Sequence, residues 1–123
     1  MRHLDRQASE RRGRRAETIA AWWLAAKGYR VLARRAATPW GEIDLVCRQG
    51  ACVVFVEVKA RQSVAAALES LGPRQRRRIA DAARHYIGRH PPLSALDCRF
   101  DLVAIGRFGL PHHLVNAWTP GAF

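Results

Sequence analysis

GEIDLVCRQGACVVFVEVKAR, residues 41–61, is the stretch that decides the fold. Residues 42–48 and 52–59 are both rich in apolar side chains, and CVVFVEVK (52–59), with its many β-branched residues, is the most strand-like run in the chain. The Gln49-Gly50 pair between them indicates a tight connection. We therefore predict a β-hairpin in which these two strands pair.

The flanking sequence places helices and further strands around this hairpin. Apolar residues recur at helical spacing from Glu10 to Lys27, and Gly28 is a natural stop for that helix. Pro73 suits a first helical position, and the helix that it begins is predicted to run to Arg89. Further strands are predicted at residues 29–36, 98–105 and, as an optional fifth, 113–118.

The order αβββαβ predicts an α/β fold with a mixed central sheet flanked by helices. We expect residues 10–123 to form a single domain and the polar residues 1–9 to be flexible. A loop is expected at residues 60–71. A chain of 123 residues suits one domain and is too short for two ordinary ones.

Positive charge is the strongest feature of the composition. Lys and Arg number 21 against 10 Asp and Glu, which gives a formal net charge of +11. Nearly all of these cations are arginines, whose planar guanidinium suits phosphate. Such an excess favours a polyanionic partner, above all nucleic acid. A ribosome- or RNA-associated role is a weaker alternative on the same charge.

Three further features indicate a cytoplasmic protein. Cys47, Cys52 and Cys98 are odd in number and form no CxxC pair, so we interpret them as reduced core cysteines. The longest apolar run is far shorter than a membrane span, so no membrane partner is expected. No apolar signal core follows the basic N-terminus.

Carboxylates and a lysine interrupt the apolar strands of the hairpin. Because side chains alternate between faces, Glu42 and Asp44 share one face of the first strand, and Phe55, Glu57 and Lys59 share one face of the second. Charged groups are rarely buried without a partner, so their presence here needs a reason. The plain alternative is a structural ion pair on a solvated strand face.

The register of the hairpin decides whether these charges meet. If Arg48 pairs with Val53, then Asp44 falls opposite Glu57, with Cβ atoms about 4.5–5.5 Å apart. The same register places Glu42 opposite Lys59. A slip by one residue would break this convergence.

Two carboxylates at that distance repel each other, and a divalent cation would remove the penalty. Hard oxygen ligands suit Mg²⁺ or Mn²⁺, the cofactors expected here. Such a site can hydrolyse a phosphodiester, with Lys59 orienting water or offsetting charge on the phosphate. Glu17 lies on the apolar side of the first helix and is a further candidate ligand. Its alternative is a surface glutamate paired with Arg14.

At these residues the sequence resembles the YraN family, small bacterial proteins described as predicted endonucleases. That family is similar to archaeal Holliday-junction resolvases within the PD-(D/E)xK nuclease superfamily. The resemblance covers about residues 13–105. Its matching stretches are GRRAETIA (13–20), GYRVL (28–32), GEIDLV (41–46), VFVEVKAR (54–61) and RFDLVAI (99–105).

The resemblance implies a restriction-endonuclease-like αβββαβ core with Asp44, Glu57 and Lys59 as the catalytic triad. It also implies that Glu17 and the backbone carbonyl of Val58 join the two acids as metal ligands. Where the family often has a lysine near the start of the second helix, this chain has Gln75. Resolvase-like proteins often dimerise, which leaves a homodimer open beside a monomer.

A basic run at the start of the second predicted helix is the candidate nucleic-acid surface. It comprises Arg74, Arg76, Arg77 and Arg78, and Arg61 after the third strand is assigned with it. A solvated helix face is the equally weighted alternative. The function expected is a metal-dependent endonuclease acting on branched or structured DNA. The alternative is a non-catalytic nucleic-acid-binding module in recombination, repair or DNA uptake.

Overall fold

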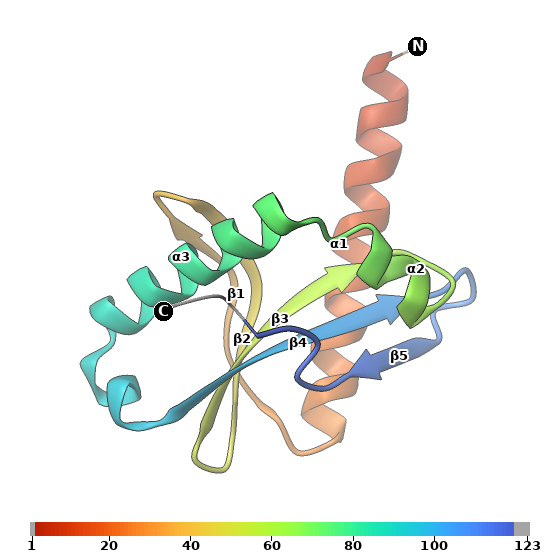
Figure 1. Cartoon of the computed structure of the whole chain (residues 1–123). Helices are drawn as coiled ribbons and strands as arrows, with labels where there is room; N and C mark the ends of the chain where they lie inside the picture. The colour runs from red at the N-terminus through yellow and green to blue at the C-terminus, as the bar shows by residue number, and fades with distance from the viewer. Residues whose placement is uncertain (1, 120–123) are drawn as a thin grey trace.

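A five-stranded sheet in the order β1-β2-β3-β4-β5 is the centre of the structure. The computed structural model describes the backbone of residues 2–119 and the side chains from Glu10 onward (Figure 1). Strands β3 and β4 are parallel, and every other neighbouring pair is antiparallel, so the sheet is mixed as predicted. The strands are β1 (Arg30–Thr38), β2 (Gly41–Gln49), β3 (Cys52–Lys59), β4 (Asp97–Ile105) and β5 (Pro111–Leu114).

Helices cover both faces of this sheet, as Figure 1 shows. Helix α1 (Arg2–Ala26) packs Ala20 and Leu24 against one face, and α3 (Pro73–Arg89) packs Ile79 and Ala83 against the other. Between β3 and β4 the chain also forms the short helix α2 (Val64–Glu69) and the 3-10 turn η1 (Pro91–Ala95). The α/β class and the αβββαβ order predicted from the sequence are confirmed.

Several predicted boundaries were wrong, each for a local reason. Helix α1 begins at Arg2 rather than Glu10, while the side chains of residues 1–9 lie outside the described part and their flexibility stays a prediction. The predicted loop at 60–71 contains α2, whose first turn is capped by the Ser63 hydroxyl accepting from the Ala66 N–H. The fifth strand ends at Leu114 because Asn116 adopts a left-handed conformation with φ 54°.

The two faces of β2 do not alternate strictly through its whole length. Strict alternation would place Ile43 and Leu45 on one face, yet Ile43 packs in the cluster under α3 and Leu45 in the cluster under α1. On the N-terminal side of Leu45, β2 is still paired with β1 but no longer with β3. This change in β2 is what positions the candidate site.

A buried ionic network ties β4 and β5 to the helix α1 side of the sheet. Asp101 has no exposed surface, and its carboxylate accepts from Arg99, from His113 Nε2 at 2.7 Å and from the Asn116 N–H. Burial disfavours the charge, but these hydrogen bonds outweigh it and hold the pKa of Asp101 below its usual range. Asp101 is therefore the structural partner of Arg99.

Removing this carboxylate should be costly because Arg99 and the nearly buried His113 would lose their shared acceptor. We expect Asp101→Ala to lower the free energy of unfolding by about 3–5 kcal/mol. Urea denaturation followed by circular dichroism measures the change. Asp97→Ala, at an exposed position on the same strand, is the control and should cost less than about 0.5 kcal/mol. Equal effects of the two substitutions would contradict the structural role of the network.

Candidate active site

Strands β2 and β3 separate at Asp44, and this fork is the base of the candidate site. Arg48 pairs with Val53 as the predicted register requires, and the pairing continues to Leu45 and Val56. At the next position the Asp44 side chain takes over, because its Oδ2 accepts the Val58 backbone N–H at 2.8 Å. A backbone donor that has lost its strand partner is thereby satisfied by a side chain.

The fork brings together part of what the register predicted. Asp44 and Glu57 converge closely enough for the charge of Asp44 to raise the pKa of Glu57. Glu42, however, is not paired with Lys59, because the pairing of β2 with β3 ends at Leu45. Glu42 is an exposed residue near the turn between β1 and β2. The predicted pairing of Glu42 with Lys59 was wrong because β2 has already left β3 at this point.

Glu57 is the most unusual carboxylate of the site. It is only 5% exposed, and its Oε2 has no hydrogen-bond partner among the described residues. Its Oε1 accepts from Gln75 Nε2 at 3.3 Å and lies 3.8 Å from Lys59 Nζ. Neither contact is short, so a buried anion is left with weak compensation.

Burial raises the pKa of both acids. For Glu57, loss of hydration is the main cause and the negative charge of Asp44 the second, while Lys59 and Arg78 oppose the rise. For Asp44, burial again outweighs the Val58 hydrogen bond, and the charge of Glu17 adds to the rise. The pair therefore resists holding two negative charges unless a cation joins it.

Glu17 lies next to the site, but its carboxylate forms a salt bridge with an arginine. Its Oε1 accepts from Arg35 Nε at 2.7 Å, and the Glu17 side chain is 13% exposed against 34% for Arg35. The alternative partner considered from the sequence, Arg14, does not hold it. Across the described side chains, no group of three or more His, Cys, Asp or Glu is placed to bind a metal. The carboxylates that face each other are thus Asp44 and Glu57, a number that suffices for Mg²⁺.

Helix α3 supplies two residues at the fork: Gln75, which was not predicted to belong there, and Arg78, which was predicted only as a nucleic-acid contact. Gln75 contacts Glu57, and Arg78 Nη1 donates to the carbonyls of Trp40 and Glu42. The φ of Gly41 is +110°, which favours glycine in this turn, and a Cβ there would displace the end of the Arg78 side chain. Helical spacing could have predicted that these two residues face the sheet, since positions 75, 78, 79 and 82 share one side of a helix.

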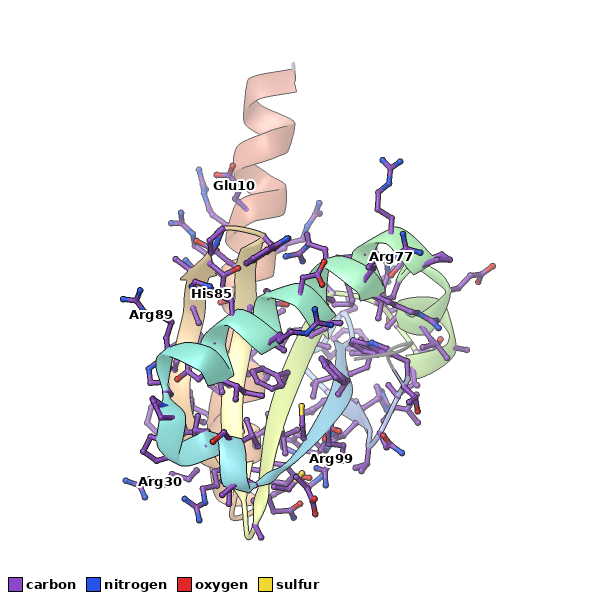
Figure 2. All side chains as sticks on the ribbon, turned by 60° about the vertical axis from the view of Figure 1, so that its left-hand side comes forward. Glu10, Arg30, Arg77, His85, Arg89 and Arg99 are labelled. Atoms are coloured by element: carbon purple, nitrogen blue, oxygen red, sulfur yellow. The ribbon has the colours of Figure 1, made fainter. Side chains whose placement is uncertain are left out.

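The five arginines predicted to contact nucleic acid divide into two groups. Arg61, Arg74 and Arg77 are exposed, and Figure 2 shows Arg77 projecting from the first turns of α3. The other two turn towards the protein's own backbone: Arg76 donates to the Leu71 carbonyl, and Arg78 holds the β1–β2 turn. These two thus also hold the start of α3 against neighbouring segments, and nucleic-acid contact by all five arginines stays a prediction.

The part of the sequence that builds this site is shared with a known protein family. Residues 16–105 match the model described as "Uncharacterised protein family UPF0102". The chain belongs to the UPF0102 family. This is the YraN family that its motifs resemble. The matched segment contains Glu17, Asp44, Glu57 and Lys59, and it ends with the last residue of β4.

Individual UPF0102 relatives match over nearly the whole chain. The UPF0102 protein of Parvibaculum lavamentivorans is 54% identical over 92% of this chain and 85% of its own length. That of Maricaulis maris is 51% identical over 94% and 91%, and that of Rhodopseudomonas palustris 47% over 93% and 88%.

Two predictions on the general character of the chain meet different outcomes. No helix in the described part of this UPF0102 member has the length and apolarity needed to cross a membrane. Cys47, Cys52 and Cys98 are free, as predicted. Cys98 is exposed, however, so the placement of all three in the core was wrong for that residue.

The raised pKa values predict how the stability of the metal-free protein changes with pH. Both acids bind protons more tightly in the folded than in the unfolded chain, so their contribution is most favourable at low pH. It is lost as the pH rises from about 4 towards about 8. We expect Glu57→Gln, which keeps the shape and removes one charge, to stabilise the metal-free protein near the upper limit by about 1–2 kcal/mol.

Urea unfolding in EDTA, at a mildly acidic and a mildly alkaline pH, measures this effect. Glu69→Gln, on an exposed residue of α2, is the matched control and should leave the pH dependence unchanged. A Glu57→Gln variant that is equally destabilised at both pH values would contradict the raised pKa of Glu57.

Proposed function

We propose that this protein is a divalent-metal-dependent endonuclease that hydrolyses phosphodiester bonds in structured DNA. The observation that carries the proposal is the pair of carboxylates at the fork between β2 and β3, with Lys59 beside it. A buried Glu57 oxygen without a hydrogen-bond partner among the described residues favours a cation over a purely structural ion pair. The strongly basic composition supplies the affinity for a polyanion.

The donor set at the fork fits Mg²⁺ or Mn²⁺. Asp44 and Glu57 offer hard carboxylate oxygens, and these metals bind with one or two carboxylates, waters and a substrate phosphate. Binding of a cation here would stabilise the ionised form of both acids. The carbonyl of Val58 is a further proposed ligand, and Glu17 would act from behind Arg35 through charge.

When bound, the metal would polarise the scissile phosphate and make a nearby water a stronger nucleophile. The residues of the chain then have separate tasks. Val58 N–H holds one oxygen of Asp44, and Gln75 orients Glu57, so both carboxylates keep a fixed position. Lys59, whose side chain is 19% exposed, can donate to a phosphate oxygen and offset the negative charge that develops there.

Cleavage of labelled DNA tests the proposal. With Mg²⁺ or Mn²⁺, we expect the wild type to cut at least one member of a panel of duplex, single strand, flap and four-way junction. Asp44→Ala and Glu57→Ala should abolish cleavage because each removes a ligand, while DNA binding survives. Lys59→Ala should slow cleavage by roughly 10²–10³-fold.

The control for this panel is Glu69→Ala, an exposed acid away from the fork, which should cut like the wild type. Cleavage retained by both Asp44→Ala and Glu57→Ala would overturn the assignment of the site.

Metal binding should also be visible without any substrate. We expect Mn²⁺ at about 100 times its dissociation constant to stabilise the wild type by about 2.7 kcal/mol, because the ion binds the folded state alone. Thermal unfolding at mildly alkaline pH measures the shift. Glu57→Gln should lose most of it, whereas Glu69→Gln should keep it. Equal shifts in all three proteins would show that the ion binds elsewhere.

A non-catalytic nucleic-acid-binding module is the second candidate, and the state of Glu17 favours it. Because the Glu17 carboxylate forms a salt bridge with Arg35, it is not available as a third metal ligand at the fork. This candidate predicts binding that falls with salt but does not depend on divalent ions. Turnover of many DNA molecules per protein, lost in Glu57→Ala, would exclude it.

That the nucleic acid is DNA and that the protein forms a homodimer are also proposals. Direct competition between DNA and structured RNA separates the endonuclease from an RNA-associated role. The homodimer and the cytoplasmic location both stay predictions. Sedimentation of the purified protein tests the homodimer.

A further inference from the structure

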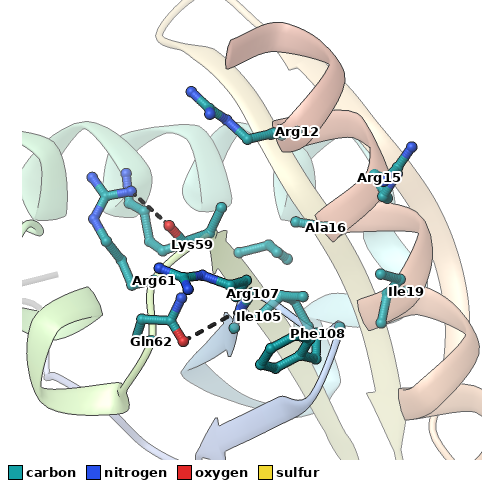
Figure 3. Close-up of a pocket in the computed structure, with 15 residues that line it drawn as sticks. Arg12, Arg15, Ala16, Ile19, Lys59, Arg61, Gln62, Ile105, Arg107 and Phe108 are labelled. Atoms are coloured by element: carbon teal, nitrogen blue, oxygen red, sulfur yellow. Dashed lines mark hydrogen bonds between the residues drawn. The ribbon is translucent and has the colours of Figure 1, made fainter. Parts of the chain in front are cut away.

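A pocket of about 860 Å³ lies beside the fork. Helix α1, the segment after β3 and the turn between β4 and β5 form its walls (Figure 3). Five cationic residues line it, and none of the described lining residues is acidic. These cations are Arg12, Arg15, Lys59, Arg61 and Arg107. Such a concentration of one charge favours an anionic ligand.

The turn that closes the pocket is held in place by its own hydrogen bonds. Gly106 N–H donates to the Leu110 carbonyl, and Gly109 N–H to that of Gly106. Gln62 Oε1 accepts the Arg107 N–H at 3.3 Å, which ties the turn to the segment following β3. The dashed line to Gln62 in Figure 3 marks this link. The side chains at positions 107 and 108 are therefore presented from a fixed backbone.

Phe108 is the unexpected residue of this turn. Its side chain lines the pocket and yet the residue is 85% exposed, whereas Phe55 and Phe100 are buried in the core. A phenyl ring exposed to water among guanidinium groups contributes nothing to the core. Aromatic rings interleaved with cations are, by contrast, the usual surface on which unpaired bases stack.

We infer that this pocket holds an unpaired nucleotide of a DNA strand, with its base on Phe108 and its phosphates on the surrounding arginines. The inference rests on the proposed function and specifies its substrate: DNA with a single-stranded segment next to the cleaved bond. Lys59 carries the connection, because it lines the pocket and also lies 3.8 Å from Glu57. One strand can therefore follow the cations from the pocket to the fork.

The same features disfavour an intact duplex as the occupant. A base within a duplex has both of its faces covered by neighbouring bases, so it cannot stack on Phe108 without leaving the helix. The pocket volume also falls in the range of about 300–1,000 Å³ that is typical of sites for single small ligands. A nucleotide is of that size, whereas two paired strands are much larger.

Binding of fluorescent DNA in EDTA tests the inference apart from cleavage. The probes are a labelled oligothymidine and a blunt duplex of equal length, followed by anisotropy. We expect Phe108→Ala to weaken binding of the oligothymidine by roughly 5- to 100-fold and that of the duplex by less than about twofold. Phe108→Tyr, which keeps an aromatic ring, should bind the single strand as the wild type does.

Trp22→Ala is the matched control, because Trp22 is 75% exposed on α1 and does not line the pocket. It should leave both affinities unchanged. An oligonucleotide containing the fluorescent base aminopurine adds a direct signal, since stacking on Phe108 quenches it. We expect quenching with the wild type and none with Phe108→Ala.

The outcomes separate this inference from the proposed function. Unchanged binding of the single strand by Phe108→Ala, or an equal loss for single strand and duplex, would overturn the pocket assignment and leave the endonuclease intact. Binding that depends on Phe108 in a protein that cuts no DNA would support the pocket and reject the endonuclease. No binding of either probe by the wild type would overturn both.

Discussion

The hydrogen bond from the Val58 N–H to the Asp44 carboxylate is the contact on which the site depends. It forms where β2 leaves β3, and it replaces the backbone acceptor that strand pairing would otherwise supply. Without that side chain, a buried donor would lose its partner or the strands would stay paired and close the fork. The separation of the strands and the position of the first acid thus have one cause.

This arrangement places two acids where neither is stable as an anion. Burial raises the pKa of Asp44 and of Glu57, and the charge of Asp44 raises the pKa of Glu57 further. The nearby cation Lys59 is 3.8 Å from Glu57, too far to form a short hydrogen bond. A fold that keeps such a pair carries a cost in stability, which is expected of a site shaped for a ligand more than for folding.

Local patterns predicted most of the fold. The predicted bounds of β3 and α3, Cys52–Lys59 and Pro73–Arg89, match the structure because each is fixed by nearby residues: a β-branched run in one and a first-turn proline in the other. The start of α1 and the helix α2 were missed, since polar residues 2–9 and an alanine-rich segment carry no strong period.

The candidate site was predictable only where strand register sufficed. Pairing of Arg48 with Val53 brought Asp44 to Glu57, but the fork itself depends on tertiary contacts. The partner of Glu17 is Arg35, which lies on the next strand, and spacing along α1 could not indicate it. Phe108 belongs to a turn whose position depends on Gln62, so sequence proximity gave no hint of the pocket.

Proton release on metal binding tests the central claim most directly. If Asp44 and Glu57 share a cation, binding of Mn²⁺ near neutral pH must displace the proton that the raised pKa keeps on Glu57. Titration calorimetry in buffers of different ionisation enthalpy should then report about one proton released per ion bound, and none for Glu57→Gln. Binding without proton release in the wild type, or equal release in both proteins, would contradict the account.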